Sequence, residues 1–95
     1  MLKLLSIVED HFEISGRGLV VIPGIPLDGD WTLRIGDKVL LELPNGTSTT
    51  TIIRGIEMAG GKRLFVPLLL GAELNKEAVP IGTKIWVDQQ VLDNT

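Results

Sequence analysis

Glycine and proline residues divide this chain into short apolar runs, and this punctuation limits the possible folds more than any other feature. The chain has 11 glycines and 5 prolines, spread along its length. Short apolar runs bounded by turn residues are typical of an antiparallel sandwich or barrel, not of a helical domain. We therefore predict an all-β fold of about six strands, at residues 11–14, 19–22, 39–43, 47–56, 64–70 and 83–87.

Tight turns are predicted between several of these runs. Gly16-Arg17-Gly18 supplies the glycines that a hairpin turn requires. Pro44-Asn45-Gly46 contains Asn-Gly, the strongest short hairpin signal. Gly36-Asp37 forms a connection before the run at residues 39–43, Asp28-Gly29-Asp30 is a turn, and residues 59–63 are expected to loop out.

Two prolines bear on the predicted strands, because a residue without an N–H cannot donate to the ladder. Pro23-Gly24 should interrupt its strand with a bulge or bend, as happens at barrel corners. Pro67 lies in a nearly continuous apolar run, typical of a strand buried on both faces, and should mark an edge or a bulge. Residues 72–78 hold the only reasonable helix formers and allow at most about two turns. Residues 88–95 are polar and expected to fray.

The size and charge of the chain limit its function. With 95 residues and 10.3 kDa it is one domain, residues 1–95, whose core we expect at about residues 8–87. The absence of cysteine removes disulfides and cysteine zinc sites, and it favours a reducing cytoplasm. Residues 1–8 are apolar but far shorter than the ~20 residues of a membrane span, so they are interpreted as structure and no membrane partner is expected. The net charge of −3 argues against tight, sequence-independent binding to nucleic acid.

The inventory of reactive side chains does not support catalysis. His11 is the sole histidine and cysteine is absent, so no nucleophile, base and orienting group can be assembled. We expect His11 on a strand surface. Glu9 and Asp10 should point to opposite faces of a strand rather than chelate a metal ion together. No phosphate-loop motif accompanies Gly16-Arg17-Gly18. We therefore predict no enzyme activity, no cofactor, no metal and no bound nucleotide.

Two separated segments carry a resemblance to a known family. Residues 8–18 read Val-Glu-Asp-His-Phe-Glu-Ile-Ser-Gly-Arg-Gly and lead into Leu19-Val20-Val21, and residues 54–58 read Arg-Gly-Ile-Glu-Met. Their order and spacing resemble the second domain of the translation elongation factors, above all the elongation factor Tu family. The resemblance implies a small closed antiparallel β-barrel, here as a chain without the GTPase domain that accompanies it in the family.

In that family the second domain helps to hold the aminoacylated 3′ end of tRNA. An acidic pair and a Phe line the space for the esterified amino acid, and the Glu of the second segment lies against the terminal adenine. By resemblance these roles fall on Glu9, Asp10, Phe12 and Glu57. The family places an aromatic residue or His and then a basic residue after Glu-Met. This chain has Ala59-Gly60 there instead.

Each of these residues also has a purely structural interpretation. Phe12 alternates with Ile14 and fits a core position, while Glu9 and Asp10 fit a solvated segment before a strand. Glu57 fits an exposed ion pair with Arg54 or Lys62, and Arg17 fits a hairpin tip that pairs with an acid across the barrel mouth. Two functions therefore remain open. One is a non-enzymatic module that contacts an RNA 3′ end or another translation component, and the other is a protein–protein interaction module without RNA binding.

The apolar content suggests that part of the surface meets another chain. The hydrophobic fraction is 44% and the mean hydropathy +0.30, which is high for a small barrel. We predict a homodimer or an obligate protein partner, with Trp31, Trp86 and Phe65 as candidate interface residues. In the competing interpretation the two tryptophans close the barrel ends and the apolar strand at residues 64–70 is wholly internal.

Overall fold

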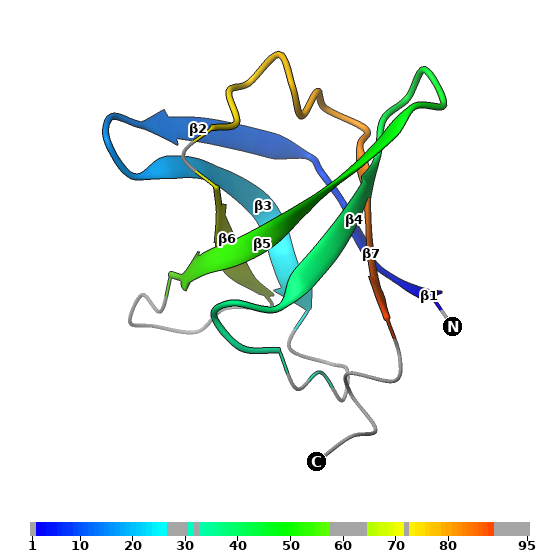
Figure 1. Ribbon diagram of the computed structural model, residues 1–95, viewed down its shortest axis with the longest axis horizontal. Coiled ribbons are helices and arrows are strands. Elements are labelled where there is room, and N and C mark those ends of the chain that lie inside the picture. The colour runs from blue at the N-terminus through cyan, green and yellow to red at the C-terminus, as the bar shows by residue number, and fades with distance from the viewer. Residues whose placement is uncertain (1, 27–30, 32, 58–64, 72, 89–95) are drawn as a thin grey trace.

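Over the residues that the computed structural model describes, seven antiparallel strands form one sheet in the order β1-β7-β4-β5-β6-β3-β2 (Figure 1). The structure describes residues 2–26, 31, 33–57, 65–71 and 73–88. The strands are β1 (Leu2–Ile7), β2 (Asp10–Ile14), β3 (Gly18–Pro26), β4 (Lys38–Glu42), β5 (Ser48–Ile56), β6 (Phe65–Leu70) and β7 (Lys84–Asp88). The all-β class predicted from the glycine and proline punctuation is confirmed.

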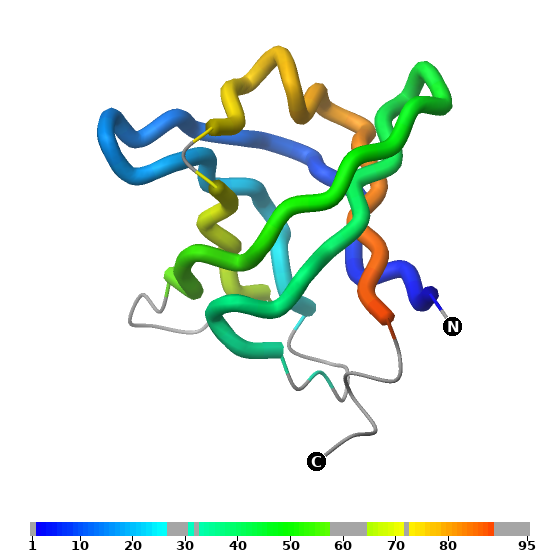
Figure 2. Tube along the Cα trace, viewed as in Figure 1, coloured from blue at the N-terminus to red at the C-terminus, as the bar shows by residue number. Residues whose placement is uncertain are grey.

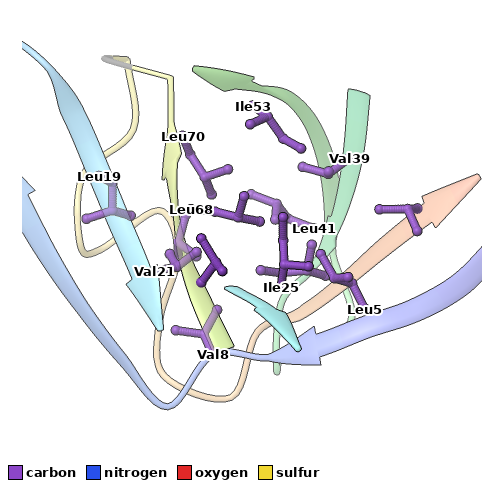
Figure 3. Close-up of a cluster of buried hydrophobic side chains, with 14 residues drawn as sticks. Leu5, Val8, Leu19, Val21, Ile25, Val39, Leu41, Ile53, Leu68 and Leu70 are labelled. Carbon is purple, nitrogen blue, oxygen red and sulfur yellow. The ribbon is translucent and has the colours of Figure 1, made fainter. Parts of the chain in front are cut away.

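The sheet curves around one hydrophobic core. Along β4, Val39 and Leu41 are buried while their neighbours are more exposed, and Ile85 and Val87 alternate in the same way along β7. This period of two assigns one face of each strand to the core. Figure 3 shows core side chains, Val39 and Leu41 among them, converging from different strands, and Figure 2 shows the curved path of the chain. The buried cluster consists of Leu5, Val8, Leu19, Val21, Ile25, Val39, Leu41, Ile53, Val66, Leu68, Leu70, Val79, Ile85 and Val87.

The described residues show the predicted antiparallel sheet but not its predicted closure into a barrel. The strand order has two ends, β1 and β2, and no ladder joins those two strands within the part of the chain that the structure describes. They are consecutive in the chain and are separated by Val8 and Glu9 alone. The Val8 N–H donates to the Thr83 carbonyl at 2.8 Å, and the Glu9 N–H donates to the Ile22 carbonyl at 2.8 Å. The segment between the two edge strands is therefore hydrogen-bonded to Thr83, just before β7, and to β3, and these two strands lie next to the two ends of the sheet.

Three expectations about element boundaries need correction. The described residues form seven strands rather than about six, because residues 2–7 form β1, which pairs with β7. Asp88 is the last residue of β7 and does not belong to a frayed tail. The described residues of 72–78 form turns, not a helix. Gly71 precedes this short segment, and its hydrogen bonds include Leu74 N–H to the Gly71 carbonyl and Ala78 N–H to the Asn75 carbonyl, each at 3.1 Å, which are turn-type bonds.

Pro23 and Pro67 lie at one bulge, where the sequence predicts a bulge or bend at Pro23-Gly24 and an edge or bulge at Pro67. In the β3–β6 ladder Val21 pairs with Leu68 and Ile25 pairs with Val66, and the register shifts between the two pairs. Residues 22–24, which include a cis Ile22–Pro23 peptide bond, thus lie opposite Pro67. Since β6 lies between β5 and β3, Pro67 occupies a bulge and not an edge. A proline is tolerated at such a position because no ladder N–H is required there.

The predicted turns among the described residues are also present. The Arg17 N–H donates to the Ile14 carbonyl at 2.9 Å in the β2–β3 hairpin. The Gly46 N–H donates to the Leu43 carbonyl at 2.9 Å between β4 and β5, and the Asp37 N–H donates to the Arg34 carbonyl at 3.1 Å before β4. The predicted turn at residues 28–30, the loop at 59–63, Met58 and the chain end at 89–95 lie outside the described residues.

Candidate ligand-binding face

Phe12 lies on the outer side of the sheet, not in the core. It pairs with Val20 across the β2–β3 ladder, Val20 pairs with Leu69 of β6, and Leu69 pairs with Gly55 of β5. Directly opposed residues share one face of a sheet. The inward positions on β3 and β6 are the core residues, so this row faces outward. We call the outer surface of β2, β3, β6 and the end of β5 the Phe12 face.

A second row on the Phe12 face carries two of the acidic candidates. Asp10 pairs with Ile22, and the Glu57 N–H donates to the Pro67 carbonyl at 3.0 Å. Asp10 and Glu57 thus lie at the two sides of this row, with β3 and β6 between them. Measured along the sheet, three strand spacings between their backbones amount to about 14 Å.

The floor between these positions is apolar. Phe12 is 47% exposed, whereas Val20 is 8% and Leu69 is 5% exposed although both face outward, so neighbouring side chains cover them. Gly55 ends the row without a side chain, and a Cβ there would come within 3.1 Å of the Leu69 side chain. The sequence analysis missed Val20, Leu69 and Gly55 as site residues, because only the ladder register reveals that they lie beside Phe12.

Glu57 is held by an ion pair with the hairpin tip. Its Oε1 lies 3.5 Å from the Arg17 guanidinium, and both side chains are exposed. The predicted pairing of Arg17 with an acid is therefore confirmed. The sequence suggests Arg54 or Lys62 as the partner of Glu57, but the partner that the structure shows is Arg17, and Lys62 lies outside the described residues. Exposed pairs of this kind contribute roughly 0–1 kcal/mol. A ligand could replace Arg17 at Glu57 at little cost.

Glu9 and Asp10 differ in their surroundings. Glu9 is exposed and precedes β2, and its backbone bonds to β3. Asp10 is exposed as the first residue of β2, and its Oδ1 accepts the His11 N–H at 2.8 Å. One carboxylate oxygen of Asp10 is thus engaged locally, and the other oxygen remains an acceptor for a ligand.

His11 is not on the strand surface, contrary to the prediction. It is half-buried, and its Nδ1 lies 2.8 Å from the Val79 carbonyl. Because a carbonyl only accepts, the Nδ1 atom must carry a proton and donate. Two residues further along β2, the Glu13 Oε1 accepts the Lys76 N–H at 2.8 Å. His11 and Glu13 therefore fasten β2 to the connection between β6 and β7.

A cleft lies beside the tip of the β2–β3 hairpin. A cleft of about 440 Å³ is lined by residues 13–18 of the β2–β3 hairpin and by Glu73, Leu74 and Asn75. Its charged lining side chains are Glu13, Glu73 and Arg17. Glu13 is bonded to Lys76, and Arg17 pairs with Glu57, so both groups also have structural partners. The cleft adjoins the Phe12 face at Arg17.

The three interface candidates occupy separate places. Trp31 packs against the core, and the Lys3 Nζ lies 4.9 Å from the centre of its ring. Trp86 faces outward on β7, and its indole N–H donates to the Glu42 Oε1 at 3.0 Å. Phe65 is half-buried and pairs with Pro26 at the beginning of β6. No single surface therefore contains all three residues.

Comparison with protein-family models, with curated proteins and with solved structures finds no match in any of the three. Within the described residues no helix has the length and apolar character needed to cross a membrane. Over the same residues, no three His, Asp or Glu side chains are grouped so that they could hold a metal ion.

Proposed function

We propose that this chain is a non-enzymatic binding module whose Phe12 face receives the single-stranded 3′ end of an RNA. The observation that carries the proposal is the position of Phe12, which is exposed beside an apolar floor and shares its face with Asp10 and Glu57. Single-stranded RNA is recognised by stacking on flat side chains and by hydrogen bonds to base edges and 2′-hydroxyls. A translation component in the cytoplasm, aminoacylated tRNA in particular, is the ligand class that the resemblance implies.

The module is further proposed to work as a closed barrel. The bent segment from β1 through Val8 and Glu9 to β2 would complete the ring, because its two halves pair with β7 and with β3. The backbone bonds of Val8 and Glu9 support this view. A closed barrel has no free sheet ends, so it would hold the two acidic sides of the Phe12 face at a fixed separation.

The charge around the Phe12 face favours an aminoacylated end over a free one. Asp10 and Glu57 bring two carboxylates to its margins, and Arg17 is the cation paired with Glu57. Phosphate groups gain little from such a surface. The ammonium group of an esterified amino acid is attracted by carboxylates and by the face of a phenyl ring. We therefore expect weak binding overall and a preference for the charged 3′ end.

The experiment is a fluorescence titration with a short RNA ending in CCA, with and without an esterified amino acid, at a stated salt concentration. Phe12→Ala and Glu57→Ala should each weaken binding by about 1–3 kcal/mol, as expected for a lost stacking contact or base-specific hydrogen bond. Ile35→Ala and Glu77→Ala serve as matched controls, because both are exposed residues outside the Phe12 face. Equal weak binding by the wild type and all four variants would refute the proposal.

The excess of carboxylates also supports a second candidate function. A basic peptide segment of another protein fits acidic margins around an exposed Phe12 as well as an aminoacyl ester does. The two functions separate in a pull-down from the source cell carried out with and without ribonuclease. Capture that depends on intact RNA supports the first function. Ribonuclease-resistant capture that is lost in Phe12→Ala supports a protein–protein interaction module.

A further inference from the structure

The outer side of the other half of the sheet carries an apolar row. Leu4 of β1 pairs with Trp86 of β7, and Trp86 pairs with Leu40 of β4. The inward neighbours of these residues are core side chains, so the row faces away from the core. On the same face of β1, Leu2 and Ile7 continue the apolar surface, and the three β1 residues are between 36% and 50% exposed. We call this surface the Trp86 face.

The Trp86 face has a hollow as well as projecting side chains. A depression of about 250 Å³ is lined by Leu2, Leu40, Glu42, Ser48 and Trp86. The Trp86 ring is fixed beside it, because its N–H is bonded to Glu42. Exposed leucines next to an apolar hollow on one surface make that surface able to complement another copy of itself.

The charges that flank the apolar row have a regular pattern. On one side of the row, Lys84 of β7 lies opposite Glu42 of β4 in the strand ladder. On the other side, Asp88 of β7 and Lys38 of β4 occupy the ends of the same strands and face outward by the alternation of burial. Along each strand the sign therefore reverses from one side of the row to the other. The four charges sum to zero, so the face neither attracts nor repels a copy of itself in net terms.

We infer that the Trp86 face is the interface of a homodimer, with a two-fold axis that runs along the Leu4, Trp86 and Leu40 row. Such an axis places the residues on one side of the row opposite those on the other side in the second copy. Lys84 then faces the partner's Asp88, Glu42 faces the partner's Lys38, and Ile7 faces the partner's Leu2. Both ionic contacts are attractive and both occur twice.

The geometry of sheet packing supports a second copy as the occupant. Two sheets that pack face to face lie about 10 Å apart, and the gap is filled by side chains from both sides. Trp86 and the leucines supply this filling from each copy, with the charged residues at the rim, which is the usual anatomy of an interface. The Phe12 face lies on β2, β3 and β6 and stays accessible, so this inference does not depend on the proposed RNA binding (Figure 1).

Charge reversal tests the axis itself. The wild type should show a dimer mass by light scattering that dissociates on dilution. Lys84→Glu and Asp88→Lys should each raise the dissociation constant about tenfold at low salt, because each places like charges opposite one another. An equimolar mixture of the two variants should restore dimers as heterodimers, since every facing pair is then attractive. Circular dichroism establishes that each variant is folded.

Leu4→Gln tests the apolar row, with Ile35→Gln as the matched control on the turn before β4. Leu4→Gln should give a monomer at concentrations where Ile35→Gln remains dimeric. A wild type that stays monomeric at every concentration overturns the inference. So does a dimer that is unaffected by Leu4→Gln, or one in which the two charge variants behave like the wild type and their mixture shows no preference for heterodimers.

Discussion

Gly24 makes the tightest backbone approach in the β3–β6 bulge. Its φ is +72°, and a Cβ there would collide with the Val66 carbonyl oxygen and come within 2.8 Å of the Leu68 nitrogen. These are backbone atoms of a central strand, so they cannot move aside without breaking the ladder. The residue is therefore required both for its conformation and for its lack of volume.

Gly24→Ala should lower the free energy of unfolding by about 3–4 kcal/mol, because it combines an unfavourable φ with a backbone clash. Gly16→Ala is the matched control. Its φ of +77° is nearly the same, but nothing lies within 4 Å of an added Cβ. The control should cost only the 1–2 kcal/mol or so of the left-handed conformation. Urea denaturation measures both values, and equal losses would show that the close approach is unimportant.

At the scale of single elements, β2 acts as a clamp on the connection between β6 and β7. The Glu13 carboxylate accepts the Lys76 N–H, and His11 donates to the Val79 carbonyl. Glu13→Ala should accelerate tryptic cleavage after Lys76 about fivefold, since one hydrogen bond worth about 1 kcal/mol no longer resists local opening. Glu9→Ala, an exposed carboxylate that precedes the same strand, should leave the cleavage rate unchanged. A cleavage rate in Glu13→Ala equal to that of the wild type would contradict the clamp.

The junction between β1 and β2 provides an internal test of barrel closure. The amides of Val8 and Glu9 bond to Thr83 and Ile22 carbonyls, and they should exchange with solvent as slowly as the amides of β3 if the ring is closed. The His11 amide donates to the exposed Asp10 carboxylate and should exchange quickly. Hydrogen exchange followed by NMR resolves all three amides in one sample. Rapid exchange at Val8 and Glu9 would mean that the sheet opens there.

The sequence predicts individual turns and strands better than it predicts which strands lie beside one another. Turns and the proline bulge depend on local backbone chemistry, and Pro23-Gly24 and Pro67 were placed correctly for that reason. The first strand was not identified because residues 2–7 show no regular alternation, and they form a strand by pairing with β7 near the other end of the sequence. The surroundings of Phe12 and His11 were out of reach for the same reason, since ladder register and long-range hydrogen bonds determine them.

At the scale of the whole molecule, charge is distributed unequally. The Trp86 face is balanced, so the net charge of −3 resides elsewhere, and carboxylates border the Phe12 face. With Arg17 as the cation on that face, about one phosphate is neutralised when RNA binds. The affinity for the CCA-ended RNA should therefore fall only about threefold between 50 and 200 mM salt. A fall of a hundredfold or more, measured by the same titration, would indicate a basic surface other than the Phe12 face.

The local bond between Asp10 and the His11 amide has a consequence for solubility. Among the described residues β2 is an end of the strand order, and an exposed sheet edge is a template on which further chains can add as strands. Asp10 covers one of the outward N–H groups on that edge and places a negative charge beside it. Two such edges that approach each other bring like charges together. We therefore expect the Asp10 carboxylate to oppose edge-to-edge aggregation of the protein.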